Sequence, residues 1–392
     1  MTHGAAVPPG EHATRLGRVR ARMGERGLDT LLVFDPANMH YLTGYDGWSF
    51  YTPQGVAVTA EGDVVLFTRQ MDAAGARITT WLDDDRILGF PDDYVQQPDR
   101  HPLEWVAREL GARGVIGDTV ALEMDAYYFS PRAYEALRAS LPGTRFTDAH
   151  ELVNWVRAVK SEPELEHMRT AGRIAERVMA AGIDAVAPGV RQCDAVAAIY
   201  DAAVRGTAGV GGDYPAIVPM LPTGPGTATP HLTWSDQPFK TGEATILELA
   251  ACHRRYHCPM ARTVFLGRPP DRLVDTAAAT RDGLEAALAS VRPGVRCEDV
   301  EAAWRREIAK YGLEKSSRIG YSIGLGYPPD WGEHTMSLRP GDATELEPGM
   351  AFHMIVGMWM DGWGYELSES FYVTPDGAEC LSSFPRELAV KD

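Results

Sequence analysis

The segment from Glu248 to Thr263 is the feature that most constrains how this chain folds. It lies between two short apolar runs, residues 244–247 and 263–266, which are typical of buried strands. Between the two runs stands a basic tip that contains Arg254 and Arg255. The pattern predicts a long β-hairpin that opens with an acidic side chain and closes with an Arg-Thr pair.

Length, charge and cysteine content exclude several classes of protein. A chain of 392 residues is too long for one ordinary core, so we expect two domains. The net charge of −16 argues against a nucleic-acid partner and against an anionic membrane surface. Five cysteines without a Cys-x-x-Cys pair are typical of a reduced, cytoplasmic protein. Residues 1–12 lack the apolar core of a signal peptide, and no run approaches ~18 apolar residues, so we expect a soluble protein without a membrane span.

The periodicity of apolar residues predicts the two domains. Predicted strands and helices alternate over residues 1–155, which indicates an α/β domain. A second domain over residues 156–392 begins with a long helix, for which Ser161 is a candidate N-cap and Pro163 stands in the first turn. A loop rich in Gly, Pro and Thr, residues 211–236, interrupts this second domain, and so long a loop in a compact domain is usually functional.

Several motifs resemble the creatinase/aminopeptidase superfamily. The run from Asn38 to Gly44, Asn-Met-His-Tyr-Leu-Thr-Gly, is similar to a segment of creatinase-type N-terminal domains, and the hairpin and the strand after Pro348-Gly-Met match the catalytic domain. The resemblance implies an α/β creatinase-like N-terminal domain and an α+β catalytic domain with the pita-bread fold. It also implies a homodimer in which one subunit's N-terminal domain reaches the partner's active site.

The metal-dependent members of that superfamily carry five metal ligands, and this chain departs from them. The matching positions hold Glu248, Pro259, Tyr321, Ile355 and Glu369. Two carboxylates give too few donors for two hard cations, so we predict no metal and no other cofactor.

Two histidines of the hairpin, His253 and His257, also fail to match a metal site. On an extended or turning chain, a spacing of four residues does not place both on one face, and no His-Glu-x-x-His helix is present. We expect both at the surface or at the rim of the site.

Glu248 and Glu369 in one pocket would repel each other, and their burial is costly unless a cation binds there. An amidinium or guanidinium substrate would meet both carboxylates with N–H donors. The resemblance adds His231, in a Pro-His element, as the site histidine. A lone histidine is more often structural, but an imidazole near neutrality can take a proton from water and pass it to a leaving nitrogen.

Longer strings narrow the resemblance to the ectoine hydrolases, a metal-free group within the superfamily. They are residues 44–51, 211–224, 230–234, 255–264 and 327–333. The resemblance implies hydrolysis of the cyclic amidine of ectoine, with hydroxyectoine as a further substrate, to an N-acetyl-diaminobutyrate that a deacetylase would consume. A creatinase-like amidinohydrolase and an inactive protein that binds a cationic small molecule stay open as alternatives.

Other side chains are candidates for substrate binding. A donor for the substrate carboxylate is expected among Arg318, Tyr321 and Trp331, whereas Arg262 is expected to be structural. Two pairs of aromatic residues have two interpretations each, namely packing or contact with the cationic substrate: Tyr214 and Trp234 in the long loop, and Trp48 and Tyr51 in the N-terminal domain.

Overall fold

The computed structural model describes residue 8 and residues 10–392, which divide into two compact units between Arg157 and Ala158. Residues 1–7 and 9, where we expected no signal segment, lie outside the described residues. No helix in the described part of the chain combines the length and the apolar character needed to cross a bilayer.

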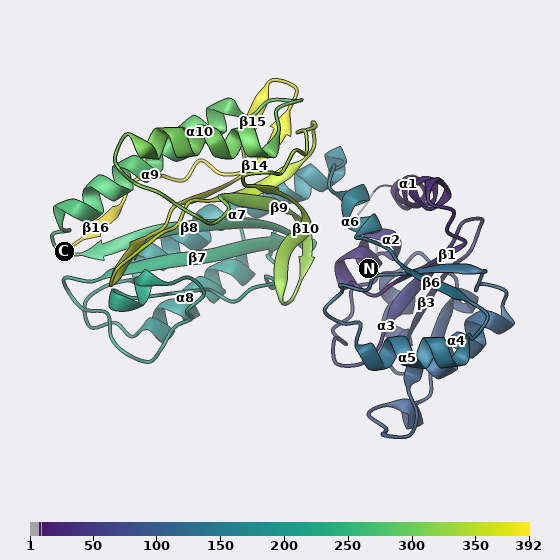
Figure 1. Cartoon of the computed structure of the whole chain (residues 1–392). Helices are drawn as coiled ribbons and strands as arrows, with labels where there is room; N and C mark the ends of the chain where they lie inside the picture. Colours follow the sequence, from purple (N-terminus) through teal and green to yellow (C-terminus); the bar gives the residue numbers. More distant parts are fainter. Residues whose placement is uncertain (1–7, 9) are drawn as a thin grey trace. The chain divides into compact units, whose positions relative to one another are not determined.

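The first unit is a mixed sheet with helices packed against it (Figure 1). Its six strands run in the order β4-β3-β2-β1-β5-β6, with β1–β2 and β2–β3 antiparallel and the other pairs parallel. The strands are β1 (Thr30–Val33), β2 (Gly55–Thr59), β3 (Val64–Arg69), β4 (Ile87–Phe90), β5 (Thr119–Leu122) and β6 (Arg145–Asp148). The helices are α1 (Glu11–Glu25), α2 (Pro36–Thr43), α3 (Ala73–Thr79), α4 (Pro102–Ala112), α5 (Pro131–Ser140) and α6 (Leu152–Arg157), with short 3-10 turns at Asp84–Arg86 and Asp92–Tyr94.

Helix α2 forms where the sequence is rich in turn-forming residues. The Asp35 carboxylate caps it by accepting hydrogen bonds from the backbone N–H groups of Ala37 and Asn38, and Pro36 fits the first helical position. The helix ends at Gly44, whose φ of 80° is favourable for glycine. All eight residues of α2 are buried, so this helix depends on packing and shows no amphipathic pattern.

The second unit is an α+β structure built on one curved sheet. Two helix pairs enclose the strands in Figure 1: α7 (Glu162–Ala185) with α8 (Gln192–Arg205), and α9 (Asp271–Ser290) with α10 (Cys297–Ala309). A 3-10 turn, η3 (Gly224–Ala228), lies in the long loop. The strands are β7 (Ala244–His253), β8 (Tyr256–Leu266), β9 (Gly320–Tyr327), β10 (Asp330–Leu338), β11 (Ala351–Ile355), β12 (Met358–Met360), β13 (Trp363–Tyr365), β14 (Ser368–Thr374), β15 (Gly377–Cys380) and β16 (Ala389–Lys391).

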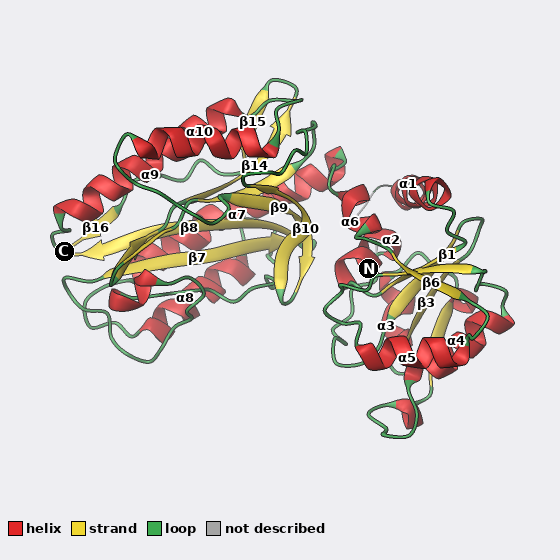
Figure 2. Ribbon diagram, viewed as in Figure 1, coloured by secondary structure: helices red, strands yellow, loops and turns green. Residues whose placement is uncertain are grey.

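The predicted hairpin lies at the centre of the second unit. Strands β7 and β8 pair antiparallel from Ala244–Phe265 to His253–Tyr256, and Glu248 stands opposite Ala261. The main sheet runs in the order β15-β14-β11-β9-β8-β16, with β7 added on β8 and β10 added on β9. Strands β7 and β8 lie side by side in Figure 2. The sheet therefore brings the hairpin β7–β8 together with β9, β11 and β14, which are distant from it in the sequence.

Candidate functional site

Glu248 lies in the middle of β7 and is held by backbone pairing on both sides. The N–H of Glu248 donates to the carbonyl of Met220, and the N–H of Met220 donates to the carbonyl of Glu248, so the Gly/Pro/Thr-rich loop runs along β7 like a further strand. The side chain is only 5% exposed, and burial raises its pKa from the ordinary 4.5 to about 7. Glu248 is therefore a buried carboxyl group poised to titrate near neutrality.

Glu366 is the carboxyl group that shares this site with Glu248. It lies beside Thr263 of β8: its N–H donates to the Thr263 hydroxyl, which in turn donates to the Glu366 carbonyl. Burial and the nearby charge of Glu248 raise the pKa of Glu366 well above its ordinary value, while Lys315 lowers it. Among the described residues, Oε1 of Glu366 has no hydrogen-bond partner. The two carboxyl groups form a buried pair that lacks a full counter-charge.

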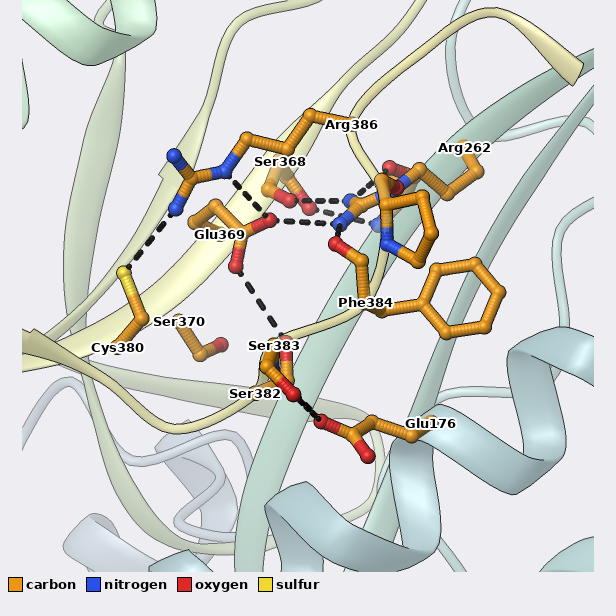
Figure 3. Close-up of polar contacts among 12 residues, drawn as sticks. Glu176, Arg262, Ser368, Glu369, Ser370, Cys380, Ser382, Ser383, Phe384 and Arg386 are labelled. Atoms are coloured by element: carbon orange, nitrogen blue, oxygen red, sulfur yellow. Dashed lines mark hydrogen bonds and ion pairs between the residues drawn. The ribbon is translucent and has the colours of Figure 1, made fainter.

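The structure corrects the prediction that Glu369 belongs to this pair. Its Oε1 accepts a 2.6 Å hydrogen bond from Nη2 of Arg262 and a 3.2 Å hydrogen bond from Nε of Arg386, as Figure 3 shows. Successive side chains of β14 point to opposite faces of the sheet. Glu369 lies on the same face as Phe371 and Val373, which belong to the hydrophobic core. Glu366, just before the strand, follows the alternation of the opposite face. Glu369 is a structural anchor, and Arg262 is structural as predicted from the sequence.

Tyr321 and Trp331 are brought together with two residues that the sequence did not single out. The Trp331 Nε1–H donates to the Tyr321 hydroxyl at 2.8 Å, and this hydroxyl lies 3.0 Å from Nδ1 of His353. Nε2 of His353 lies 2.8 Å from the Ser368 hydroxyl, which also accepts the N–H of Ala261 at 2.7 Å. Burial, together with the charge of Glu248, raises the pKa of Tyr321. The network thus ends at Ala261, the residue directly opposite Glu248.

Arg318 borders this network from a more exposed position. Its guanidinium carbon lies 4.5 Å from the centre of the Tyr321 ring, and Nη1 donates to the Ser337 hydroxyl at 3.1 Å. Burial lowers the pKa of His353 to about 3, with a smaller contribution from the charge of Arg318, so the imidazole is neutral at physiological pH. Arg318 is consequently an accessible cation beside a neutral, buried histidine.

His231 lies apart from these contacts. Its backbone has a φ of 66°, its side chain is exposed, and within the described residues its ring makes no hydrogen bond or ion pair. The neighbouring Leu232 carbonyl accepts the N–H of Leu221, which places the segment beside the stretch that pairs with β7. The structure brings the loop that carries His231 to the strand of Glu248, but it does not bring the imidazole to the carboxylate.

The other two loop candidates are partly exposed. Trp234 is half-buried at the end of the loop. Tyr214 is also half-buried, and the guanidinium of Arg255 lies over its ring at 3.8 Å from the centre. A ring whose face is already covered by a guanidinium has that face less available to a substrate cation.

The prediction that both hairpin histidines lie at the rim is wrong for His257. His257 is fully buried, its Nε2 accepts the N–H of Ala216, and its Nδ1 lies 3.0 Å from the Arg255 carbonyl. His257 therefore ties the long loop to β8, and burial lowers its pKa to about 4. His253 is only half-buried.

In the first unit, the two predicted aromatic contacts are open to solvent. Trp48 is 61% exposed and Tyr51 is 64% exposed, although Trp48 packs edge-on against Phe50. Neither side chain is part of the core of its own unit.

The five positions that carry metal ligands in metal-dependent relatives do not form a metal site here. Pro259 is buried in β8 with its carbonyl accepting the Ser370 hydroxyl, the Tyr321 hydroxyl is held by Trp331, and Glu369 is held by Arg262. No three His, Cys, Asp or Glu side chains among the described residues are close enough to hold an ion. The donor set does not fit a metal pair.

Glu366, His353 and Ser368 are the site residues that the sequence reasoning missed. A signal for Glu366 was present, because period-two alternation puts Glu369 in phase with the core residues Phe371 and Val373. No local pattern marks His353 or Ser368, whose meeting depends on the pairing of β11 with β9 and β14.

Two family models match the chain. Residues 15–159 match the creatinase/prolidase N-terminal domain, and residues 166–375 match metallopeptidase family M24. The ectoine hydrolase of Halomonas elongata is 49% identical over 388 residues, which cover 97% of each chain. The Xaa-Pro dipeptidase of Lactobacillus helveticus is 24% identical, over 96% of this chain and 98% of its own.

Solved structures confirm the predicted fold class. A prolidase from Thermococcus sibiricus superimposes with a TM-score of 0.83 over 97% of this chain and 99% of its own, at 18% identity. A dipeptidase from Mycobacterium ulcerans superimposes with a TM-score of 0.78 over 97% of this chain and 98% of its own, at 23% identity. The α/β first unit and the α+β second unit correspond to a creatinase-type domain and a pita-bread domain.

Proposed function

Because the chain belongs to metallopeptidase family M24, with a creatinase/prolidase N-terminal domain, we propose that it is a hydrolase that opens the cyclic amidine ring of ectoine. The observation that carries this proposal is the buried pair of carboxyl groups, Glu248 and Glu366, whose pKa values are both raised. The similarity to the Halomonas elongata enzyme supports the choice of substrate.

The carboxyl pair would recognise the charged ring of the substrate. The amidinium of ectoine is a planar cation, and its N–H groups would donate charge-assisted hydrogen bonds to Glu248 and Glu366. Burial raises the pKa values of both groups, and the charge of Glu248 raises that of Glu366 further. Binding of the substrate cation offsets these costs. Held by its nitrogens, the ring presents the carbon between them to water.

The remaining chemistry needs proton transfer and a donor for the substrate carboxylate. Water attack on the amidinium carbon releases one proton, and cleavage of the C–N bond to give N-acetyl-diaminobutyrate requires one proton on the leaving nitrogen. His231 remains our candidate for the residue that accepts the proton released by the attacking water. Arg318, whose guanidinium is exposed beside Tyr321, is the candidate for binding the substrate carboxylate.

We propose that the reaction proceeds without a metal, because the donor set of this site does not fit one. The exposed Trp48 and Tyr51 suit a role in a homodimer, in which the N-terminal domain of one subunit contacts the substrate of the other. Hydroxyectoine, which has the same ring and charge with one added hydroxyl group, is a further proposed substrate. A deacetylase acting on the acetylated product is the expected next enzyme.

Turnover of ectoine by chelator-treated protein tests the proposal. Proton NMR would follow loss of ectoine and formation of N-acetyl-diaminobutyrate, with untreated protein as the control. We expect the same rate in both samples. Binding without product would favour an inactive binding protein, and release of urea from creatine would favour a creatinase-like amidinohydrolase.

Two variants test the roles assigned to Glu366 and His231. Glu366→Gln keeps the shape of the side chain but removes its charge, so it should raise KM for ectoine at least tenfold while the fold is retained. His231→Ala should lower kcat by about 10²-fold or more if His231 transfers the proton. Unchanged turnover in His231→Ala would exclude that role.

A further inference from the structure

The hydrogen-bond network around His353 has a property that follows from counting its protons. The network has three members, Tyr321, His353 and Ser368, which meet in two contacts of 3.0 Å and 2.8 Å. Each outer hydroxyl also accepts one fixed N–H, from Trp331 at one end and from the Ala261 backbone at the other. Neither fixed donor can be reversed, because an indole and an amide N–H only donate.

A neutral imidazole fixes the direction of both inner contacts together. A neutral ring carries one N–H and one lone pair, so it donates to one hydroxyl and accepts from the other. Ser368 and His353 are fully buried, and among the described residues no further acceptor lies within hydrogen-bond distance of the Tyr321 or Ser368 hydroxyl. One hydroxyl proton of the network is therefore always left over.

The tautomer of His353 decides which hydroxyl carries that proton. With the proton on Nε2, the ring donates to Ser368 and accepts from Tyr321, and Ser368 keeps the spare proton. With the proton on Nδ1, the ring donates to Tyr321 and accepts from Ser368, and Tyr321 keeps it. The two arrangements contain the same number of hydrogen bonds, and each leaves one hydroxyl proton without an acceptor, so the hydrogen-bond count favours neither.

Both ends of the network are connected to Glu248. Tyr321 feels the charge of the Glu248 carboxylate, and the Ser368 hydroxyl is bonded to Ala261, the cross-strand partner of Glu248. Strand pairing fixes this arrangement, because His353 stands directly opposite Tyr321 on β9 and two residues along from Ser368 on β14.

We propose that Tyr321, His353 and Ser368 form a proton relay that moves one proton past Glu248 each time His353 changes tautomer. In one passage, Ser368 gives its proton to a leaving nitrogen, Nε2–H passes its proton to Ser368, and Tyr321 passes its proton to Nδ1. Tyr321 then regains the proton that His231 has taken from the attacking water, so one proton enters the network and one leaves it. This inference rests on the proposed function for the identity of the substrate, but the relay itself is a property of the three side chains.

The imidazole of His353 reports the relay without any substrate. In protein labelled with 15N at histidine, the nitrogen shifts distinguish a protonated from an unprotonated ring nitrogen, and His353→Gln identifies the signals by their loss. Tyr321→Phe leaves only Ser368 to accept a proton from the ring, so the Nε2–H tautomer should dominate. Ser368→Ala should give the opposite tautomer, Nδ1–H, and the wild type should lie between. The same tautomer in both variants would overturn the relay.

Kinetics test whether the relay acts in turnover. Tyr321→Phe and Ser368→Ala should each lower kcat by about 10²-fold with a smaller change in KM, since general acid–base groups typically contribute 10² to 10⁴. Because both break the same chain, the double variant should be within about threefold of the slower single variant. Multiplied effects in the double variant would show independent roles and refute the relay. A wild type that fails to turn over ectoine would refute only the proposed substrate, since the tautomer measurement needs none.

Discussion

Replacement of Glu248 by glutamine should make the second unit more stable at alkaline pH. In the folded protein, burial raises the Glu248 pKa from 4.5 to about 7, so the folded state resists loss of the proton that the unfolded chain gives up readily. The stabilisation from the protonated carboxyl is complete below pH 4.5 and is lost as the pH rises toward 7. Glutamine has no proton to lose and avoids this loss.

The size of the effect follows from the pKa. Each pKa unit corresponds to about 1.4 kcal/mol, so a rise from 4.5 to about 7 makes the ionised form roughly 3 kcal/mol less favourable in the folded state. At pH 8 the Glu248→Gln variant should therefore exceed the wild type by roughly 3 kcal/mol, and at pH 5 by under about 1 kcal/mol. In a unit of this size, such a difference corresponds to roughly 6 to 12 °C in Tm.

Thermal unfolding of the full chain at pH 5 and pH 8, followed by calorimetry, would measure this difference. Glu369→Gln is the matched control, because the same change there breaks the ion pair with Arg262 and should destabilise the protein at both pH values. An equal Tm for Glu248→Gln and wild type at pH 8, or a gain that is larger at pH 5, would refute the reasoning.

Three further predictions concern the charges around the site. Glu369→Ala should cost about 3–5 kcal/mol in urea unfolding, because it leaves the buried Arg262 guanidinium without its carboxylate. Lys160→Met should cost a similar amount, since it removes one member of the buried Lys160–Glu333 ion pair, whose atoms lie 2.6 Å apart; Lys160→Arg, measured in the same assay, would recover part of it. Added Mn²⁺ should leave Tm unchanged to within about 1 °C, because the donor set does not fit a metal; an increase that depends on metal concentration would contradict this.

The sequence predicted the frame of the molecule better than the identity of its second carboxyl group. The hairpin, the long helices of the second unit and the strands of the first unit have periodicities that local packing enforces. The position of Glu369 next to a familiar motif suggested a site residue, but its direction depends on the strand phase that it shares with Phe371 and Val373. His257 was misplaced for a related reason, because burial by the long loop arises only from tertiary contact with Ala216.

Arg262 contacts both Glu369, which stabilises the fold, and the backbone at Ser368, which belongs to the proposed relay. Nη2 of Arg262 donates to Glu369 on the core face, while Nη1 donates to the backbone carbonyls of Ser368 and Ala261 at 2.7 and 2.9 Å (Figure 3). These carbonyls belong to the two residues whose contact forms one end of the relay. Glu369 is therefore a positioning residue that acts through Arg262. Its loss should both destabilise the unit and shift the His353 tautomer, whereas Glu366→Gln should weaken substrate binding and leave that tautomer unchanged.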